Sequence, residues 1–227
     1  MLAQVNHAII AEILVFLKEN QTFFEDKSGK DALEKLTLPK PVKEYLFQAD
    51  ADQFISEFSE LVRFITGSVR KQEFGKLKEN QLLEAIVKFW SFDVMDRLDV
   101  LTTDFYLKSK KDQLNQLADL VLGEGMVSDA VRDLIATASA QELAKHVREF
   151  VGQVLASPLI VVQTPREVAY EFKKEIREQL RAEYGDGSLP VFQINRNLIG
   201  GMRVFVDSEV KDFSWLGRIK LITSLKT

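Results

Sequence analysis

The sequence contains no cysteine, and this absence excludes several classes of protein. Without thiols the chain forms no disulfides, offers no thiol nucleophile and builds no zinc–thiolate site, and it suits a reducing compartment. Histidine is almost absent as well, since only His7 and His146 occur. Neither lies in an HExxH or Ser-His-Asp pattern, so we interpret both as structural residues. We therefore do not expect a histidine-rich metal site.

Strong charge of one sign and long hydrophobic runs are also missing. The net charge is −4, and neither half of the chain carries the strong basic patch that is typical of nucleic-acid binders. The most apolar stretch, residues 2–18, is interrupted by Glu12 and is shorter than the roughly 20 residues of a membrane span. It also lacks the basic start and cleavage site of a secretory signal. We predict a buried or partner-facing helix there.

Proline is scarce, with none between Pro41 and Pro158, which favours a helical bundle over a sheet. Helical periodicity dominates the first 156 residues, and Pro41 fits the first turn of one of these helices. Apolar residues recur at spacings of three and four from Phe54 to Val69, for example, with Asp50 or Asp52 as the expected N-cap.

The pattern changes at residue 157, where short apolar runs alternate with turn residues. The sequence Thr164-Pro165-Arg166-Glu167 has the form of a capped helix start, in which Thr164 and Glu167 cap each other and Pro165 takes the first position. This helix is expected to reach Tyr184. Strands are expected at 159–162, 189–194, 202–206 and 210–213, and Ser214 is expected to cap a final helix.

These elements predict an α+β protein with two domains. Residues 1–156 form an all-helical bundle. Residues 157–227 form a small α/β domain in the order strand, helix, strand, strand, strand, helix. No repeat, low-complexity tract or long linker interrupts this organisation.

The adjacent glycines Gly200 and Gly201 do not form a phosphate loop. A Walker loop or a dinucleotide fingerprint needs a helix directly after its glycines, and here a strand is expected to follow. The pair instead permits positive φ or a bulge, and allows another backbone to approach closely where the strand begins.

No cluster of residues indicates catalysis. Asp93, Asp96 and Asp99 follow one another at intervals of three, but Arg97 lies among them, and a solvated helix face is the favoured interpretation over a metal site. We expect no catalytic residue, no metal and no cofactor. A binding or structural role is favoured over an enzyme.

The stretch "INRNLIGGMRVFVDSEVKDFSWLGRIKLITSL" resembles the C-terminal signature of the delta subunit of F-type ATP synthases, called the oligomycin-sensitivity-conferring protein in mitochondria. Residues Leu198, Ile199, Gly200 and Gly201 match its Leu-Ile-Gly-Gly. Asp212 and Ser214 fall at the expected spacing, and Arg218 and Ile219 take the places of a basic and an apolar residue.

The match has departures and limits. Asn195 and Arg196 replace the usual Asp-Pro, and Phe213 and Trp215 replace smaller residues, which indicates a more apolar local surface or a different partner. The resemblance covers the last part of the chain, from Ser157. The preceding residues match the family only in being helical, and are longer than its usual bundle.

The resemblance implies a non-catalytic stator subunit in the peripheral stalk of an ATP synthase, which serves ATP synthesis and proton transport. It implies that the N-terminal bundle holds the alpha subunits of the catalytic head through a groove that accepts an amphipathic helix. It implies that the C-terminal domain, with the motif residues, docks the b-type stalk helices. The protein would then lie in the cytoplasm, peripheral to the inner face of the cell membrane.

A second hypothesis is an adaptor or scaffold of another machine that reuses a stator-like domain. The E-type stalk subunit of vacuolar and archaeal ATPases and the flagellar export stator protein share the Gly-Gly and the Asp. The Asn-Thr that the E-type pattern prefers is absent here. Both relatives normally start with a long straight helix, whereas prolines and loops interrupt the first fifty residues of this chain.

Overall fold

The computed structural model describes residues 2–27, 29–65, 79–98, 107–109, 111–112, 125–155, 157–215 and 217. The chain divides into two compact units, Met1–Val154 and Leu155–Thr227. The boundary expected after residue 156 falls beside this division.

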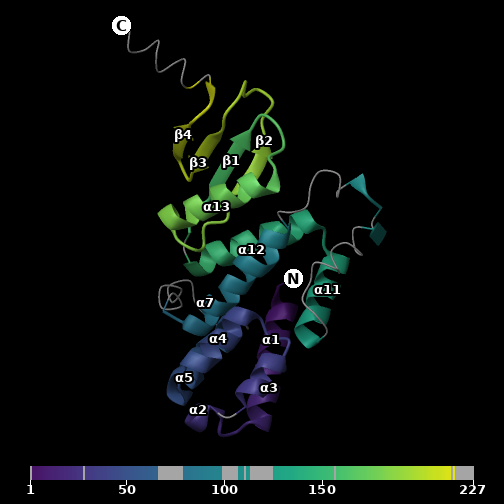
Figure 1. Ribbon diagram of the computed structural model, residues 1–227, viewed down its shortest axis with the longest axis vertical. Helices are drawn as coiled ribbons and strands as arrows, with labels where there is room; N and C mark the ends of the chain where they lie inside the picture. The colour runs from purple at the N-terminus through teal and green to yellow at the C-terminus, as the bar shows by residue number, and fades with distance from the viewer. Residues whose placement is uncertain are drawn as a thin grey trace. The chain divides into compact units, whose positions relative to one another are not determined.

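The described residues of the N-terminal unit form helices joined by turns and loops (Figure 1). In chain order the elements are α1 (Ala3–Glu19), α2 (Phe23–Asp26), α3 (Lys30–Lys35), α4 (Lys40–Gln48), α5 (Ala51–Ile65), α7 (Gln81–Lys88), η2 (Phe89–Val94), α8 (Met95–Leu98), α11 (Met126–Thr137) and α12 (Ala140–Leu155). As predicted, Pro41 lies in the first turn of α4. Of the two expected caps of α5, Asp50 makes the hydrogen bond, since its Oδ1 accepts from the backbone N–H of Gln53 at 2.8 Å.

The apolar stretch 2–18 lies almost entirely in α1, one face of which is buried. Its Asn6 is buried and accepts a hydrogen bond from Nε1 of Trp90 at 3.0 Å. Its Glu12 is buried too and accepts from the backbone N–H and the hydroxyl of Thr37, at 3.0 and 2.6 Å. Such buried hydrogen bonds fix the register of a helix in a core, because a buried polar group needs a protein partner there. No helix in the described part of the chain is long and apolar enough to cross a membrane.

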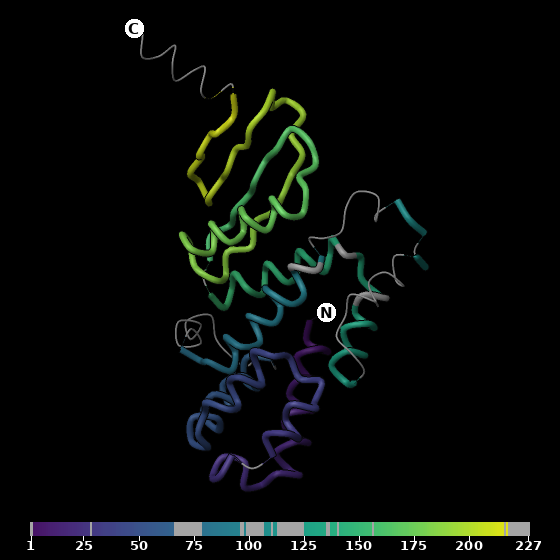
Figure 2. The backbone as a smooth tube through the Cα atoms, in the orientation of Figure 1, coloured from purple at the N-terminus to yellow at the C-terminus, as the bar shows by residue number. Residues whose placement is uncertain are grey.

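The C-terminal unit contains a four-stranded mixed sheet with one long helix (Figures 1 and 2). Its elements are β1 (Ile160–Thr164), α13 (Tyr170–Tyr184), β2 (Val191–Ile194), β3 (Arg203–Val206) and β4 (Glu209–Asp212). The strand order is β2-β1-β3-β4. β1 pairs in parallel with β2 and antiparallel with β3, and β4 returns antiparallel to β3.

One face of this sheet carries the core of the domain. Alternate residues of β1 and β3 pack against α13, because side chains on a strand point to opposite faces in turn. The cluster comprises Ile160, Val162, Val204, Val206, Ile176 and Leu180. Together with the helical unit, this domain confirms the predicted α+β class and the predicted order of strand, helix and three strands. The expected final helix lies outside the described residues beyond Gly217.

The predicted start of α13 is wrong. The helix begins at Tyr170, its N-cap is Ala169, and no side chain caps it. Thr164 is instead the last residue of β1, paired with Ile194, and its carbonyl accepts from the N–H of Asn195 at 2.7 Å. Its hydroxyl donates to the carbonyl of Arg166 at 2.8 Å. Pairing with β2 therefore holds Thr164 in an extended conformation.

Neither Pro165 nor Glu167 consequently starts a helix. Both lie in a five-residue loop between β1 and α13. The capping pattern at Thr164 is local, whereas its strand partner Ile194 lies thirty residues further along the chain. The pairing determines the conformation of Thr164, and the residues around Thr164 give no indication of it.

Candidate functional site

The two parts of the recognised motif meet in space. Gly201 has φ +76°, in the left-handed region that favours glycine. A Cβ at this position would overlap the carbonyl oxygen of Phe213 and lie 3.0 Å from Cα of Ser214. The backbone N–H of Trp215 donates to the carbonyl of Gly200 at 3.1 Å. At Gly201 the prediction of positive φ and close backbone approach is confirmed, and the approaching segment is 213–215.

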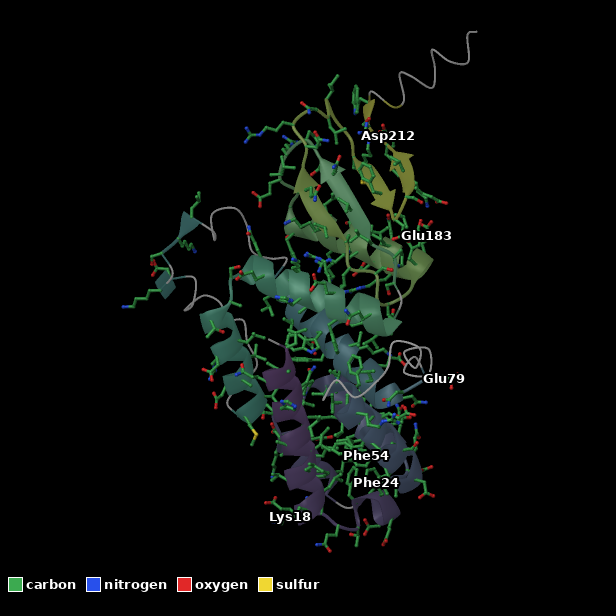
Figure 3. The ribbon with its side chains drawn as sticks, turned by 180° about the vertical axis from the view of Figure 1, so that it is seen from behind. Lys18, Phe24, Phe54, Glu79, Glu183 and Asp212 are labelled. Atoms are coloured by element: carbon green, nitrogen blue, oxygen red, sulfur yellow. The ribbon has the colours of Figure 1, made fainter. Side chains whose placement is uncertain are left out.

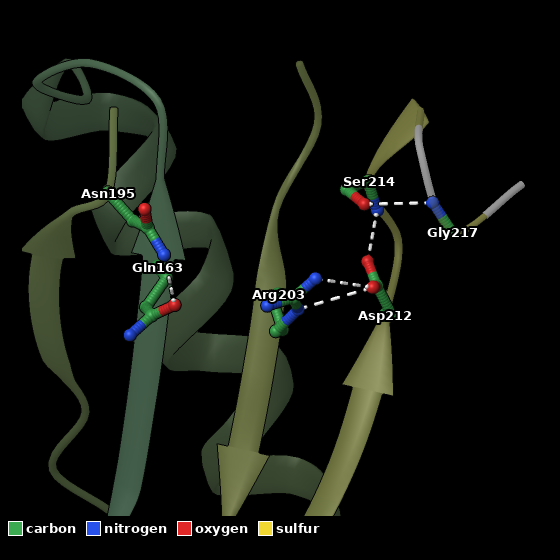
Figure 4. Close-up of polar contacts among 6 residues, drawn as sticks. All are labelled: Gln163, Asn195, Arg203, Asp212, Ser214 and Gly217. Carbon is green, nitrogen blue, oxygen red and sulfur yellow. Dashed lines mark hydrogen bonds and ion pairs between the residues drawn. The ribbon is translucent and has the colours of Figure 1, made fainter. Parts of the chain in front are cut away.

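Asp212 organises the turn that follows β4 (Figure 4). Its Oδ1 accepts from the backbone N–H of Ser214 at 2.9 Å, and its Oδ2 accepts from Nη2 of Arg203 at 2.8 Å. The hydroxyl oxygen of Ser214 accepts from the N–H of Gly217 at 3.1 Å, which is the bond that an N-cap makes three residues on. Asp212 and Ser214 thus fix the direction in which the chain leaves the sheet.

Hydrogen bonding lowers the pKa of Asp212 to about 2. The largest cause is Ser214, through its side chain and then its backbone N–H, and the Arg203 guanidinium adds to it. Asp212 is therefore ionised at neutral pH and acts as a fixed acceptor.

The segment before the glycines is a turn with one buried and one exposed apolar residue. The side-chain oxygen of Asn195 accepts from the N–H of Asn197 at 3.1 Å, and its carbonyl accepts from the N–H of Leu198 at 3.0 Å. The side chain and the carbonyl of Asn195 therefore both hold this turn. Leu198 is buried, whereas Ile199 is 75% exposed. The buried leucine anchors the turn, and the isoleucine is presented to a partner or to solvent.

A hollow of about 600 Å³ lies beside the glycines. It is lined by the loop 164–169, by Phe172 of α13 and by Ile199–Gly201. Large apolar side chains at and around it remain exposed, with Phe172 and Phe213 at 45% and Trp215 at 65%. Exposed apolar side chains gathered in one place are typical of a protein interface. The loop that displaced the predicted helix start forms one wall of this hollow.

Of the predicted motif residues, the structure brings six together: Leu198, Ile199, Gly200, Gly201, Asp212 and Ser214. Arg218 lies outside the described residues. Sequence reasoning did not single out Phe172, which lines the hollow, or Arg203, which pairs with Asp212. The register of β3 and β4 brings Arg203 opposite Asp212. This ion pair could have been predicted from the sequence only by centring the hairpin on Asp207-Ser208.

A second polar cluster lies on β4 and α13, near Glu183 in Figure 3. Nζ of Lys211 donates to Oε1 of Glu183 at 2.6 Å and to the hydroxyl of Tyr184 at 2.7 Å. The hydrogen bond to Glu183 is the main cause that raises the pKa of Lys211, and the same bond lowers the pKa of Glu183. Both groups stay charged at neutral pH, so this cluster ties α13 to β4 and offers no proton donor near neutrality.

The N-terminal unit exposes apolar residues on two helices. Leu14 and Val15 of α1 are 48% and 49% exposed, and Ile55 of α5 is 61% exposed. At the end of this unit Phe24 and Phe54 stack with ring centroids 5.1 Å apart (Figure 3). These surfaces suit helix binding, since an amphipathic partner is recognised by apolar residues on neighbouring turns.

The hollow beside the glycines is lined by one basic and one acidic side chain, those of Arg166 and Glu167. Within the described ranges, no group of three or more histidine, aspartate or glutamate side chains could hold a metal ion. No protein-family model matches this chain, and no curated protein matches it. The delta-subunit relationship therefore stays a prediction made from the motif residues.

Proposed function

We propose that this protein is a non-catalytic stator subunit of a rotary ATPase, which links the catalytic head to a b-type peripheral stalk. The observation that carries the proposal is the apolar surface around Ile199, which is assembled by the two halves of the motif. The glycines and Asp212 fix the backbone conformation of this surface, and the proposal gives them no catalytic role. A binding surface on a rigid scaffold is what a torque-resisting link requires.

The stalk site is placed at the hollow beside Gly200 and Gly201. Ile199 and Trp215 supply exposed apolar area, and aromatic anchors of this kind dominate the energy of helix-binding interfaces. The capped turn at Ser214 and the ion pair of Arg203 with Asp212 keep these side chains in place. Pre-organisation of this kind reduces the entropy lost on binding.

The head site is placed on the N-terminal unit, at the exposed apolar residues of α1 and α5. Ile55 is the most exposed large apolar residue of these two helices. In this proposal it contacts the amphipathic helix of an alpha subunit. The two partners then bind different units of one chain, which is the arrangement needed to connect head and stalk.

The proposal is tested by giving head and stalk separately to the tagged protein. Head and stalk subunits are recovered from the membranes of the source organism, dissociated, and offered to wild type, Ile199→Asp and Ile55→Asp. A charge placed in an apolar hot spot should weaken binding at least about tenfold. We expect Ile199→Asp to lose the stalk and keep the head, and Ile55→Asp to do the reverse.

Leu159→Asp is the matched control, because Leu159 is 60% exposed and lies in the C-terminal unit away from the residues that line the hollow. It should bind both partners as wild type does. Failure of wild-type protein to bind either partner would contradict the proposal. Loss of both partners in either variant, with folding intact by circular dichroism, would contradict the separate assignment of the two sites.

A further inference from the structure

Two hydrogen-bond donors lie without an acceptor at the hollow beside the glycines. One is the guanidinium of Arg166, an exposed residue that lines the hollow from the loop between β1 and α13. Its backbone carbonyl accepts from the hydroxyl of Thr164, but among the described residues its side chain makes no hydrogen bond and no ion pair. Glu167, the other charged residue of this wall, already interacts with another group. Of the two charges that line the hollow, the positive one therefore lacks a partner.

The other donor is the indole N–H of Trp215. A Cβ on Gly200 would lie 3.1 Å from Cδ1 and 3.3 Å from Nε1 of Trp215, so the indole rests against the backbone of Gly200, which itself lines the hollow. The backbone N–H of Trp215 donates to the carbonyl of Gly200 at 3.1 Å and holds the residue in this position. Trp215 is 65% exposed, and its Nε1 has no acceptor in the described part of the chain.

Trp90, the other tryptophan of the chain, has its donor satisfied. It is fully buried, and its Nε1 donates to Oδ1 of Asn6 at 3.0 Å. Tryptophan N–H groups usually find an acceptor when they are buried, because a buried donor without a partner costs free energy. An occupant that covers Trp215 must therefore bring an acceptor of its own. The hollow selects for an occupant that carries acceptors beside apolar groups.

The exposure of the walls favours a protein segment over a small molecule. Phe172 and Ile199, which line the hollow, are 45% and 75% exposed. A small-molecule pocket buries most of the surface of its ligand, and side chains as exposed as these do not enclose one. An amphipathic helix is instead bound along one face, with its apolar residues in the hollow and its polar residues at the rim.

We propose that the stalk segment bound at this hollow is an acidic amphipathic helix. One of its carboxylates pairs with Arg166, a second acceptor binds the indole N–H of Trp215, and its apolar residues pack on Phe172 and Ile199. This inference rests on the proposed function and adds the chemistry by which the stalk is recognised. Charge complementarity of this kind selects the partner and raises the rate of association.

The charge is tested by reversing it in the full-length protein. Arg166→Glu and Lys174→Glu are each titrated with purified stalk subunits. Lys174 is also an exposed cation and lies on α13, but it does not line the hollow. A like charge that faces the carboxylate of the partner should weaken stalk binding at least about tenfold, whereas the Lys174 control should bind as wild type does. Arg166→Lys, which keeps the positive charge, should lose less affinity than Arg166→Glu.

The position of the partner is tested with a label at Trp215. Protein grown with fluorotryptophan should give two fluorine resonances, because the chain has two tryptophans, and Trp215→Phe assigns them. Unlabelled stalk subunits contribute no signal. Adding stalk should shift the Trp215 resonance, and adding head subunits should leave it in place. Trp215→Phe also removes the indole N–H and should weaken stalk binding about fivefold, which is the effect of one hydrogen bond.

Each outcome decides the proposal. Weak stalk binding in Arg166→Glu but not in Lys174→Glu, together with a stalk-induced shift at Trp215, supports it. Stalk binding that Arg166→Glu leaves unchanged, or a Trp215 resonance that stalk does not move, overturns it while the stator proposal stands. A Trp215 resonance that moves with the concentration of the protein alone also overturns it and assigns the hollow to a second copy. Wild-type protein that binds no stalk overturns both proposals.

Discussion

Gly201 and Gly185 both have a left-handed backbone, with φ of +76° and +91°, but their surroundings differ. A Cβ at Gly185 would meet nothing within 4 Å, whereas at Gly201 it would overlap the backbone of Phe213. Gly201→Ala should therefore lower the free energy of unfolding by about 3 kcal/mol, from strain and overlap together. Urea denaturation measures this loss.

Gly185→Ala is the control, because it carries the backbone strain without the overlap. The ψ of Gly185 is 166°, in a region that glycine adopts far more readily than other residues, so the expected loss is about 2 kcal/mol. Equal losses for the two variants would show that close approach of the 213–215 segment contributes nothing to the role of Gly201. Comparing the two variants therefore separates backbone strain from steric overlap as the reason for glycine at position 201.

Asp212 gives a prediction about pH. Its folded pKa of about 2 lies below its ordinary value of 3.8, so its contribution to stability is full above pH 3.8 and is lost as pH falls towards 2. Asp212→Asn removes the titration and keeps an acceptor for the Ser214 N–H. The difference in unfolding free energy between wild type and variant should shrink between pH 5 and about pH 2.5. A difference that stays constant over this range would contradict the conclusion that hydrogen bonds to the ionised Asp212 carboxylate stabilise the fold.

At the scale of elements, the start of α7 depends on a buried polar group. Asn80 caps α7 by accepting from the N–H of Leu83 at 2.8 Å, and its amide donates to the carbonyl of Glu57 at 2.8 Å. Asn80→Ala should cost about 2 kcal/mol of stability, at the upper end for a cap because a buried acceptor loses its partner.

Asn80→Asp supplies the informative comparison. Aspartate caps exposed helices as well as asparagine does. Here it cannot donate, and its oxygen would face the Glu57 carbonyl and the Glu60 carboxylate, which Asn80 reaches at 3.1 Å. Asn80→Asp should therefore fail to restore stability in thermal denaturation. Full stability in this variant would show that the cap alone matters.

Local patterns predicted some elements and misplaced others for physical reasons. The first turn of α4 and the cap of α5 depend on neighbouring residues, so Pro41 and Asp50 were found. The start of α13 depends on the pairing of Thr164 with Ile194, which no local window contains. The π-helix η2 at Phe89–Val94 was also missed, because helical periodicity does not distinguish a wider turn inside a buried helix.

The candidate site was predictable only in part. The glycines and Asp212 were recognisable because their conformational demands leave few residue choices. The apolar surface that these residues organise could not be predicted, because Phe172 lies at a helix position that periodicity assigns to the core. Its 45% exposure results from the late start of α13 and the loop that precedes it.

At the scale of the whole molecule, the change of pattern at residue 157 was the strongest signal in the sequence. The structure has compact units Met1–Val154 and Leu155–Thr227, with helices in the first and the mixed sheet in the second. Each unit presents its own exposed apolar residues. A protein that joins two partners needs two such surfaces, and this is the physical basis of the stator proposal.

The most direct test is affinity capture of the tagged wild-type protein from the native membranes of its source organism, under gentle solubilisation and with mass spectrometry. A stator subunit should bring down the alpha, beta and b-type subunits of a rotary ATPase in stoichiometric amounts. Recovery of an unrelated assembly without ATPase subunits would contradict the stator proposal. The Leu-Ile-Gly-Gly domain would then be a reused module in an adaptor of another machine.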